Sequence, residues 1–480
     1  MTKRTMQKES WAERSSQNPA SATDPSACAV PDTSLLIEEF RRQYAHRQEA
    51  IDVSFRSLVP WVKLGDQYTH QLHPYPAKLL PHIANFFVNS SRLSAQGTVL
   101  DPFCGSGTVA LEASLAGMTP YVADANPMAL LITRVKTTSY DPDVLLHQTV
   151  RTLRRARQFR TAPEIPIVNA ALWYNPKIKA ELDILMRAIC EIEDSSLRDF
   201  FLVCFSVVAR KLSFADPSIS VPVRLKSKSS LGNAGRKRVK ERLNWLRIAN
   251  PHEEFTAVCF ANVERVLRAN EAMPTRQPAI SVGRDARQLN CSLGGGRLAS
   301  SSVPLIITSP PYGRAQKYVR AMSLSLNWLR LASPLELSDL ESKTIGREHL
   351  PGRYGQAVQE FAADVEALLH RIRVVNEKRE RITRTYLSDL SAALSEIGRV
   401  TAPGGCVVLV IGNNQVCGEL LETDYFIEQE MKKLGFQTDF ILVDQIKSRG
   451  LLTKRNGTAT VISRESVLVF RLPASRDVPR

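Results

Sequence analysis

Residues 97–117 read GTVLDPFCGSGTVALEASLAG. The apolar residues at 98–100 predict a buried strand, the glycines after them a tight turn, and the alanine- and leucine-rich end a helix. Residues 120–138, PYVADANPMALLITRVKTT, repeat this order of strand, acidic tip and helix. Two such units in succession predict a parallel sheet flanked by helices, an α/β fold of the Rossmann type.

The alternation of strands and helices stops after the second unit. Residues 141–275 are expected to be mostly helical, and strand-like runs return in PAISVGRD at 278–285 and VPLIITSPPYG at 303–313. The α/β core is therefore expected to carry a helical insert between the glycine-rich turn and the SPPY segment. The expected divisions are a disordered tail at 1–34, the N-terminal part of the core at 35–140, the insert at 141–275 and the C-terminal part of the core at 276–475.

The composition is that of a basic globular protein. Hydrophobic residues make up 44% of the 480 residues, which excludes a wholly disordered chain, a collagen and a coiled-coil rod. The 63 Lys and Arg residues outnumber the 48 Asp and Glu residues, which gives a net charge of +15. This excess suggests a polyanionic partner, with nucleic acid as the first candidate. A basic protein without such a partner is the alternative.

The cysteines and the N-terminus bear on the compartment. The eight cysteines never form CxxC and are sparse, so we expect no disulfide framework. The first residues, MTKRTMQKESWAERSSQ, are polar, and the longest apolar run, FFLVCFSVVA, is too short to span a bilayer. We expect a cytoplasmic protein with no membrane partner.

The glycine-rich turn predicts a cofactor site. Gly105 and Gly107 lack Cβ atoms, so the backbone can approach a ligand closely, and the next helix points its N-terminus at that ligand. The turn has neither the Lys-Ser/Thr ending of a P-loop nor the dinucleotide pattern GxGxxG. Asp124, at the tip of the second unit, would accept hydrogen bonds from ribose hydroxyls. The alternative is a tight turn with a capping acid.

The segment Ser309-Pro310-Pro311-Tyr312 follows the buried run LIIT. A Pro-Pro pair ends a strand and fixes the backbone, which suits holding a carbonyl group in a set place. The carboxyl ends of strands in open α/β sheets are also where ligands bind. The alternative is an ordinary loop that contains prolines.

Both segments carry a resemblance to a known family. DPFCGSGT at 101–108 resembles the S-adenosylmethionine turn of amino-group methyltransferases that act on nucleic acids, and SPPY resembles the catalytic motif of the DNA enzymes. The resemblance implies a Rossmann-like class I methyltransferase sheet with S-adenosylmethionine as cofactor. It also covers APGG at 402–405 and THQLHPYPAK at 69–78, a segment that helps to enclose the methionine end of the cofactor. The cofactor-binding residues that it implies are Asp101, Pro102, Phe103, Gly105, Gly107, Thr108, Asp124, Asp285, His73 and Lys78.

Asp285, in SVGRDARQL, is similar to the acid that receives the adenine amino group, with a helix cap as the alternative. It follows the insert, whereas the usual scheme has this acid before it. Either Asp285 is not that acid or the insert occupies an unusual place.

The resemblance also assigns the chemistry of the catalytic segment. An exocyclic amine is a poor nucleophile, and hydrogen bonds to the Ser309 hydroxyl and the Pro310 carbonyl would localise its lone pair. Pro311 completes the rigid segment, and Tyr312 would stack on a base flipped out of the helix. The amine would then attack the sulfonium methyl in line. No covalent intermediate is needed, and the chain has no Pro-Cys nucleophile.

Family usage points to the target atom. SPPY is typical of enzymes that methylate cytosine N4, whereas Asp-Pro-Pro-Tyr or Asn-Pro-Pro-Tyr is typical of adenine N6. We therefore predict a site-specific methyltransferase of double-stranded DNA acting on cytosine N4. It would be a solitary modifier or the partner of a separate restriction endonuclease. The alternatives are an adenine N6 enzyme, an RNA guanine-N2 enzyme and a binding module without turnover.

Basic segments are the candidates for phosphate contacts. Residues 224–247 carry nine Lys or Arg and one acid, although a solvated basic helix would look the same. A loop near the end of the sheet is a second candidate, and 371–384 is a third, for which a solvated helix face is the favoured alternative. The histidines at 70, 73 and 82 have no accompanying cysteine or paired acid, so no metal site is expected. The expected DNA-binding residues are Arg224, Lys226, Lys228, Arg236, Lys237, Arg238, Lys447 and Arg449.

Overall fold

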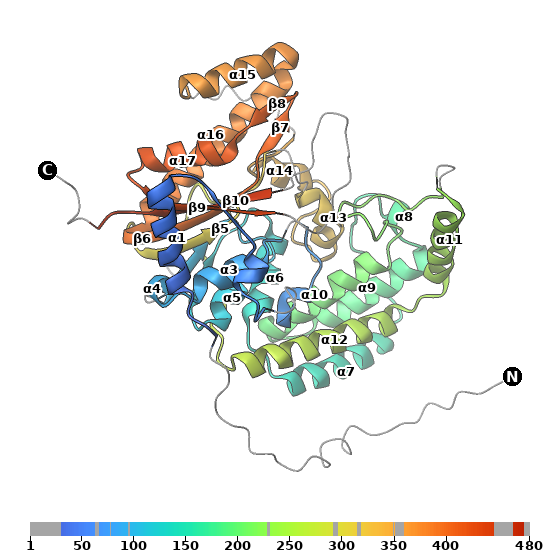
Figure 1. Cartoon of the computed structure of the whole chain (residues 1–480). Helices are drawn as coiled ribbons and strands as arrows, with labels where there is room; N and C mark the ends of the chain where they lie inside the picture. Colours follow the sequence, from blue (N-terminus) through green and yellow to red (C-terminus); the bar gives the residue numbers. More distant parts are fainter. Residues whose placement is uncertain are drawn as a thin grey trace, which may run out of the picture.

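The computed structural model describes residues 30–62, 67–76, 78–94, 97–227, 231–290, 296–313, 318–348, 350, 360–445 and 464–474. Its centre is an eight-stranded sheet (Figure 1) in the order β1-β9-β10-β6-β5-β2-β3-β4. Strand β10 runs antiparallel to both its neighbours, and the other pairs are parallel. The strands are β1 (Ile51–Val53), β2 (Thr98–Asp101), β3 (Thr119–Val122), β4 (Ile280–Ser281), β5 (Val303–Thr308), β6 (Thr401–Ile411), β9 (Gln437–Gln445) and β10 (Arg464–Arg471).

This strand order confirms the predicted Rossmann-like methyltransferase sheet. From β2 the chain proceeds outward to β3 and β4, and from β5 it proceeds the other way to β6. Strands β2 and β5 are hydrogen-bonded neighbours, with Leu100 opposite Ile306. The topological switch point therefore lies between them, and ligands bind at the carboxyl ends of strands at such a point. The glycine-rich turn follows β2 and the SPPY segment follows β5, so both predicted motifs lie at this edge.

Alternating side chains of the strands bury against helices on both faces of the sheet. Leu305 and Ile307 of β5 pack with the helices on one face, whereas Ile306 packs on the other. This is the two-residue period of a strand that is buried on both sides. One face is covered by α1 (Ser34–Arg47), α2 (Phe55–Leu58), α3 (Pro81–Val88), α4 (Ser91–Ser94) and α5 (Thr108–Leu115), and the other by α16 (Glu377–Val400) and α17 (Thr423–Lys433).

The mostly helical insert, one helix before it and two helices after the SPPY segment form a second cluster beside the sheet (Figure 1). Its core includes Phe200, Phe201, Phe205 and Trp328, which are almost inaccessible to solvent. Asp141, Asn175 and Asn250 cap helix N-termini with their side chains, and a proline follows each one. The helices are α6 (Pro127–Thr137), α7 (Pro142–Gln158), α8 (Ala170–Trp173), α9 (Pro176–Cys190), α10 (Ser195–Lys211), α11 (Asn233–Ile248), α12 (Pro251–Ala272), α13 (Tyr318–Trp328) and α14 (Leu337–Ser342).

The place of the insert accounts for the position of Asp285. Helices α7 to α12 lie between β3 and β4, and β4 rejoins the sheet in parallel beside β3. The loop after β4 therefore reaches the same edge as the other motifs although it follows the insert in sequence. What departs from the usual scheme is therefore that the helices are inserted between β3 and β4, and not that Asp285 lies at this edge.

Two details differ from the sequence expectations. Thr33 and Ser34, assigned to the tail, are buried, and the Thr33 hydroxyl donates to the Phe86 carbonyl of α3. The segment 371–384, expected to lie on one helix face, spans two helices, α15 (Ala363–Val375) and α16, because Asn376 ends one and caps the next. The remaining elements are a 3₁₀ helix (Tyr68–Gln71) and the hairpin of β7 (Asn414–Val416) and β8 (Glu419–Leu421). No helix in the described part of the chain is long and apolar enough to cross a membrane.

Candidate active site

A direct hydrogen bond joins the two motifs. Asp101 ends β2 and Thr308 ends β5, and the Thr308 hydroxyl donates to Asp101 Oδ1 at 2.6 Å. The Phe103 backbone N–H donates to the same oxygen at 3.1 Å. Thr308 directly precedes Ser309, so the glycine-rich turn, predicted to bind the cofactor, and the SPPY segment, predicted to be catalytic, share one anchoring carboxylate.

The turn places a second carboxylate beside the first. Asp124 Oδ2 accepts from the Gly105 N–H at 2.9 Å, and Oδ1 accepts from the Asn126 N–H at 2.8 Å. Burial raises the pKa of Asp101 to about 7, helped by the charge of Asp124, and burial raises the pKa of Asp124 to about 6. Two carboxylates with raised pKa values favour a ligand that brings positive charge. S-adenosylmethionine, with an ammonium and a sulfonium group, fits this requirement.

The glycines of the turn are required by its shape. Gly105 and Gly107 have φ angles of +49° and +73°, in the left-handed region that residues with a Cβ atom avoid. A Cβ on Gly107 would lie 2.6 Å from Thr133 Oγ1 of α6. The close packing of α6 on the turn therefore excludes any side chain at position 107.

Tyr75 is a site residue that the sequence reasoning missed. A Cβ on Gly105 would lie 3.5 Å from its ring, and its hydroxyl oxygen lies 3.3 Å from Asn126 Nδ2. Tyr75 is therefore the residue through which the segment 69–78 contacts the cofactor turn. In the sequence, the one feature that distinguishes Tyr75 is its position between Pro74 and Pro76.

His73 and Lys78, the two residues of the segment 69–78 that were predicted to bind the cofactor, contact other parts of the protein. His73 Nε2 lies 3.0 Å from the Ser206 hydroxyl of α10, and burial lowers the pKa of His73 to about 3. Lys78 Nζ donates to the His70 carbonyl at 3.0 Å. His70 itself contacts Glu112 of α5 at 2.6 Å. In the described residues, no group of three or more His, Cys, Asp or Glu side chains is arranged to hold a metal ion.

The catalytic segment is held by residues distant in sequence. Ser309, Pro311 and Tyr312 are half-buried and Pro310 is buried. The Tyr312 hydroxyl donates to Glu465 Oε1 of β10 at 2.9 Å. Burial, together with the charge of Glu465, raises the pKa of Tyr312 well above its usual value, so the phenol stays protonated. Glu465 thus fixes the ring that was predicted to stack on the base.

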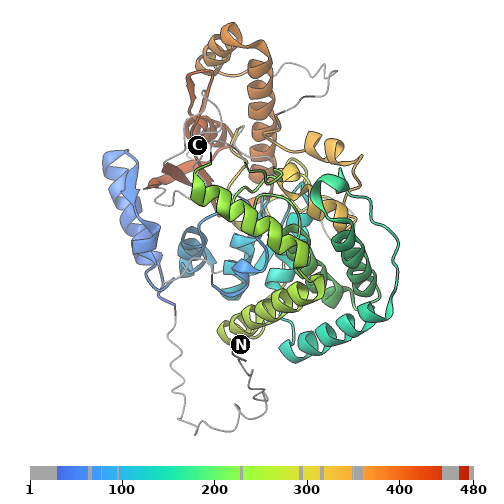
Figure 2. The same cartoon turned by 90° about the vertical axis from the view of Figure 1, so that its right-hand side faces the viewer.

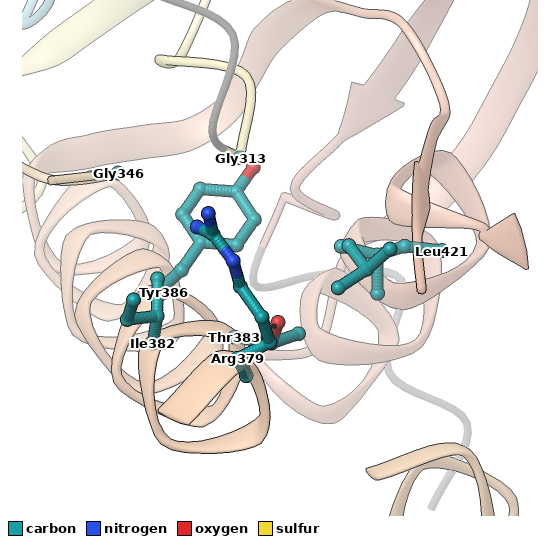
Figure 3. A pocket seen from close by; sticks show the side chains of 8 residues that line it. Gly313, Gly346, Arg379, Ile382, Thr383, Tyr386 and Leu421 are labelled. Carbon is teal, nitrogen blue, oxygen red and sulfur yellow. Dashed lines mark hydrogen bonds between the residues drawn. The ribbon is translucent and has the colours of Figure 1, made fainter. Parts of the chain in front are cut away.

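Gly313, immediately after the segment, lies against a pocket (Figure 3). Its carbonyl accepts from Asn414 Nδ2, and a Cβ at this position would lie 2.9 Å from the Tyr386 ring. Arg379 of α16 lines the same pocket as Tyr386 (Figure 3). The pocket is lined by Gly313, Gly346, Arg379, Ile382, Thr383, Tyr386, Val416 and Leu421.

Asp285 lies in the loop after β4, where its carboxylate is already engaged. Its Oδ1 accepts from Arg287 Nε at 2.8 Å and its Oδ2 from Arg287 Nη2 at 2.9 Å. Arg287 also pairs with buried Asp389 of α16, whose other oxygen pairs with Arg347. Oδ1 also accepts from the Arg287 backbone N–H at 3.0 Å, so Oδ2 is the oxygen that keeps acceptor capacity for a further donor. This network connects the loop after β4 to Arg347 and to α16, the helix that carries Tyr386.

The expected DNA-binding residues fall into three groups. Arg236, Lys237 and Arg238 are exposed on α11, a helix at the outer edge of the insert (Figure 1). Lys226 is exposed before that helix, and the Arg224 guanidinium lies 5.3 Å from the Phe214 ring centre. Lys228, Lys447 and Arg449 lie outside the described residues.

Comparisons with known proteins agree with this geometry. Residues 67–159 match the family model described as RMKL-like, methyltransferase domain. The chain is similar to the type II methyltransferase M.MvaI of Kocuria varians, with 22% identity over 82% of this chain and 87% of that protein. It is also similar to the type II methyltransferase M.BsoBI of Geobacillus stearothermophilus, with 19% identity over 91% of this chain and 92% of that protein.

A solved structure was also found by the comparisons. It is a protein of Thermus thermophilus assigned as a DNA modification methylase and complexed with S-adenosyl-L-methionine. It shares 20% identity over 38% of this chain and 52% of its own, with a TM-score of 0.19. The sheet order is that of a class I methyltransferase fold, and the matching family model and the two relatives support a methyltransferase with S-adenosylmethionine as cofactor.

Proposed function

We propose that this protein is a site-specific DNA methyltransferase that transfers a methyl group to an exocyclic amine of a flipped base, with cytosine N4 as the target. The observation that carries the proposal is the hydrogen bond between Thr308 and Asp101. It brings the end of the SPPY strand to the cofactor turn, so a methyl donor and a methyl acceptor would meet at one edge of the sheet.

The two carboxylates of the turn would hold S-adenosylmethionine. Asp101 would accept hydrogen bonds from its ammonium group, and Asp124 from its ribose hydroxyls. Asp285 would receive the adenine amine through acceptor capacity that Arg287 leaves open. When bound, the cofactor supplies an activated methyl group on a sulfonium.

The catalytic segment would act on the target amine by orientation and hydrogen bonding. The Ser309 hydroxyl and the Pro310 carbonyl would accept from the two N–H groups of the amine, which localises the lone pair on nitrogen. As the N–C bond forms, the S–C bond breaks, and the nitrogen then loses one proton to water. Because Glu465 already fixes Tyr312, little conformational entropy is lost when the base stacks on its ring.

The choice of cytosine rests on Ser309, since family usage pairs serine with N4 and aspartate or asparagine with adenine N6. Adenine N6 is the second candidate. An RNA guanine-N2 enzyme is less favoured because such enzymes usually carry Asp-Pro-Pro-Tyr. The two relatives are named type II methyltransferases. We therefore also propose that a separate restriction endonuclease recognises the same sequence.

Nucleoside mass spectrometry tests the proposal. The purified protein is incubated with S-adenosylmethionine and unmethylated genomic DNA, which is then digested to nucleosides. We expect N4-methylcytosine, and no product from the matched variant Ser309→Ala. N6-methyladenine would contradict the assignment of the base. The absence of both products, with cofactor binding intact, would contradict DNA as the substrate, and the assay would then be repeated with RNA.

A further inference from the structure

The junction of α15 and α16 projects beyond the carboxyl edge of the sheet (Figures 1 and 2). Only Asn376 separates the two helices, and its side chain caps α16 by accepting from the Arg379 N–H at 3.0 Å. We call residues 373–381 the helical tip. It belongs to the segment 371–384, the third candidate for phosphate contacts in the sequence, for which a solvated helix face was the favoured alternative.

The helical tip is anchored close to the catalytic segment. Arg379 lines the same pocket as Gly313, the residue that follows Tyr312 (Figure 3). About two turns further along α16, the Tyr386 ring packs against Gly313. At 1.5 Å per residue, Asn376 stands about 15 Å beyond Tyr386 along the helix axis. The helical tip therefore extends outward from the neighbourhood of Gly313, the residue that follows the SPPY segment.

The side chains of the tip combine apolar and positive groups. Val374 and Val375 are 75% and 66% exposed, and they are adjacent. Arg373, Lys378 and Arg381 are exposed around them and form no ion pair with any part of the chain that the structure describes. Of the two acids in the tip, Glu377 is exposed, whereas Glu380 is buried and paired with Arg384 at 2.7 Å. The exposed surface is therefore positive, with two valines at its centre.

We propose that the helical tip binds duplex DNA beside the flipped base. Arg373, Lys378 and Arg381 contact backbone phosphates, and Val374 and Val375 enter the groove next to the vacated position. The positive charge matches a phosphate backbone, and apolar side chains at base steps favour the unstacking that flipping requires. This inference rests on the proposed function, because it adds a second contact between the protein and duplex DNA beside the proposed catalytic site.

Charge removal with a matched control tests the inference. One variant replaces Arg373, Lys378 and Arg381 by Ala. The control replaces by Ala Arg151, Arg154 and Arg157, three exposed arginines of α7 on the far side of the insert (Figure 1), and changes the net charge equally. Binding of a fluorescent unmethylated duplex is measured by anisotropy over a range of salt concentrations from about 50 to about 300 mM with S-adenosylhomocysteine present. Cofactor affinity is measured separately by calorimetry.

We expect the tip variant to bind the duplex at least about tenfold more weakly, with the slope of log affinity against log salt reduced by about two to three. The control should change affinity by less than about twofold, and both should bind the cofactor as the wild type does. Equal changes in the two variants would overturn the inference.

The apolar part is tested by Val374→Thr with Val375→Thr, which keeps shape and charge. We expect methylation of genomic DNA to fall several-fold in kcat/KM while the salt slope stays that of the wild type. Unchanged kcat/KM would overturn the role of the valines. A wild-type protein that neither binds nor methylates DNA would overturn the proposed function itself. If the wild type methylates DNA and the tip variants behave as the wild type does, the inferred role of the helical tip is wrong and the proposed function stands.

Discussion

The cofactor turn and the catalytic segment lie at the same edge of the sheet but are stabilised differently. Most contacts that shape the turn come from residues near it in sequence, since Asp101 accepts from Phe103 and Asp124 accepts from Gly105, and one distant residue, Thr308, also donates to Asp101. The catalytic segment is held by distant residues, Glu465 of β10 and Asn414 of β7. A substitution in the turn should therefore affect cofactor binding, whereas one around the catalytic segment should affect turnover and spare the cofactor.

Gly107→Ala should have the largest effect, because it combines a left-handed backbone with a Cβ placed 2.6 Å from Thr133. We expect cofactor affinity measured by calorimetry to fall more than about 100-fold, with methylation lost in parallel. Gly117→Ala is the matched control, since its φ is +77° and nothing lies within 4 Å of the added atom. If both variants bind the cofactor equally well, close packing is not what requires glycine at 107.

Ser309→Ala should separate the two regions most cleanly. Loss of the hydroxyl acceptor should lower kcat by about 100- to 1,000-fold, in the range seen when one transition-state hydrogen bond is removed. Cofactor affinity should stay within about twofold of the wild type. A variant that keeps its kcat would remove Ser309 from the catalytic machinery.

Gly313→Ala tests the distant support of the catalytic segment. The added Cβ would lie 2.9 Å from the Tyr386 ring, so the segment or the ring must shift. We expect kcat to fall about 10- to 100-fold with cofactor affinity unchanged, since small displacements at a reacting centre are costly. Tyr386→Leu in the same chain should restore part of the activity by making room. A fall in cofactor affinity as large as the fall in kcat would contradict the proposed difference between the turn and the catalytic segment.

The pH dependence should be confined to the turn. Asp101 and Asp124 have pKa values raised to about 7 and about 6, so both are partly protonated in slightly acid solution. Cofactor affinity should rise by about tenfold between about pH 5.5 and 7.5, because only the ionised acids attract its positive groups. Asp101→Asn should flatten this profile.

The same shifts predict the stability of the ligand-free protein. A carboxyl whose pKa is higher in the folded than in the unfolded state favours folding at low pH, and this contribution is lost as pH rises through about 6 to 7. Addition of cofactor should therefore raise Tm more at about pH 8 than at about pH 5.5. An equal rise at both pH values would contradict the coupling.

Tyr312→Phe should have a small effect. It removes the hydrogen bond to Glu465 but keeps the ring, so we expect kcat/KM to fall about fivefold, the worth of about 1 kcal/mol. Glu465→Gln, which keeps an acceptor oxygen, should be milder still. Tyr312→Ala, which also removes the stacking surface, should nearly abolish methylation. Equal losses for Phe and Ala would show that the hydroxyl, not the ring, is what matters.

Much of the fold was predictable from short patterns. The strand and turn around Asp101 and the similar unit around Asp124 predicted neighbouring parallel strands, and the sheet has them side by side. Capping residues followed by proline, such as Asp141 and Asn250, mark helix starts in the insert. These features depend on local backbone preferences and on side-chain periodicity, which a sequence expresses directly.

The sequence by itself determined the sheet type, the cofactor turn and the SPPY segment, because each is made by consecutive residues. The tertiary structure alone decided which distant side chains support them: Tyr75 against the turn, Glu465 and Tyr386 around the catalytic segment, and the helical tip beside it. It also decided that β4 returns to β3 across the insert. Such contacts depend on how the sheet brings remote strands and helices together, and no local pattern records that.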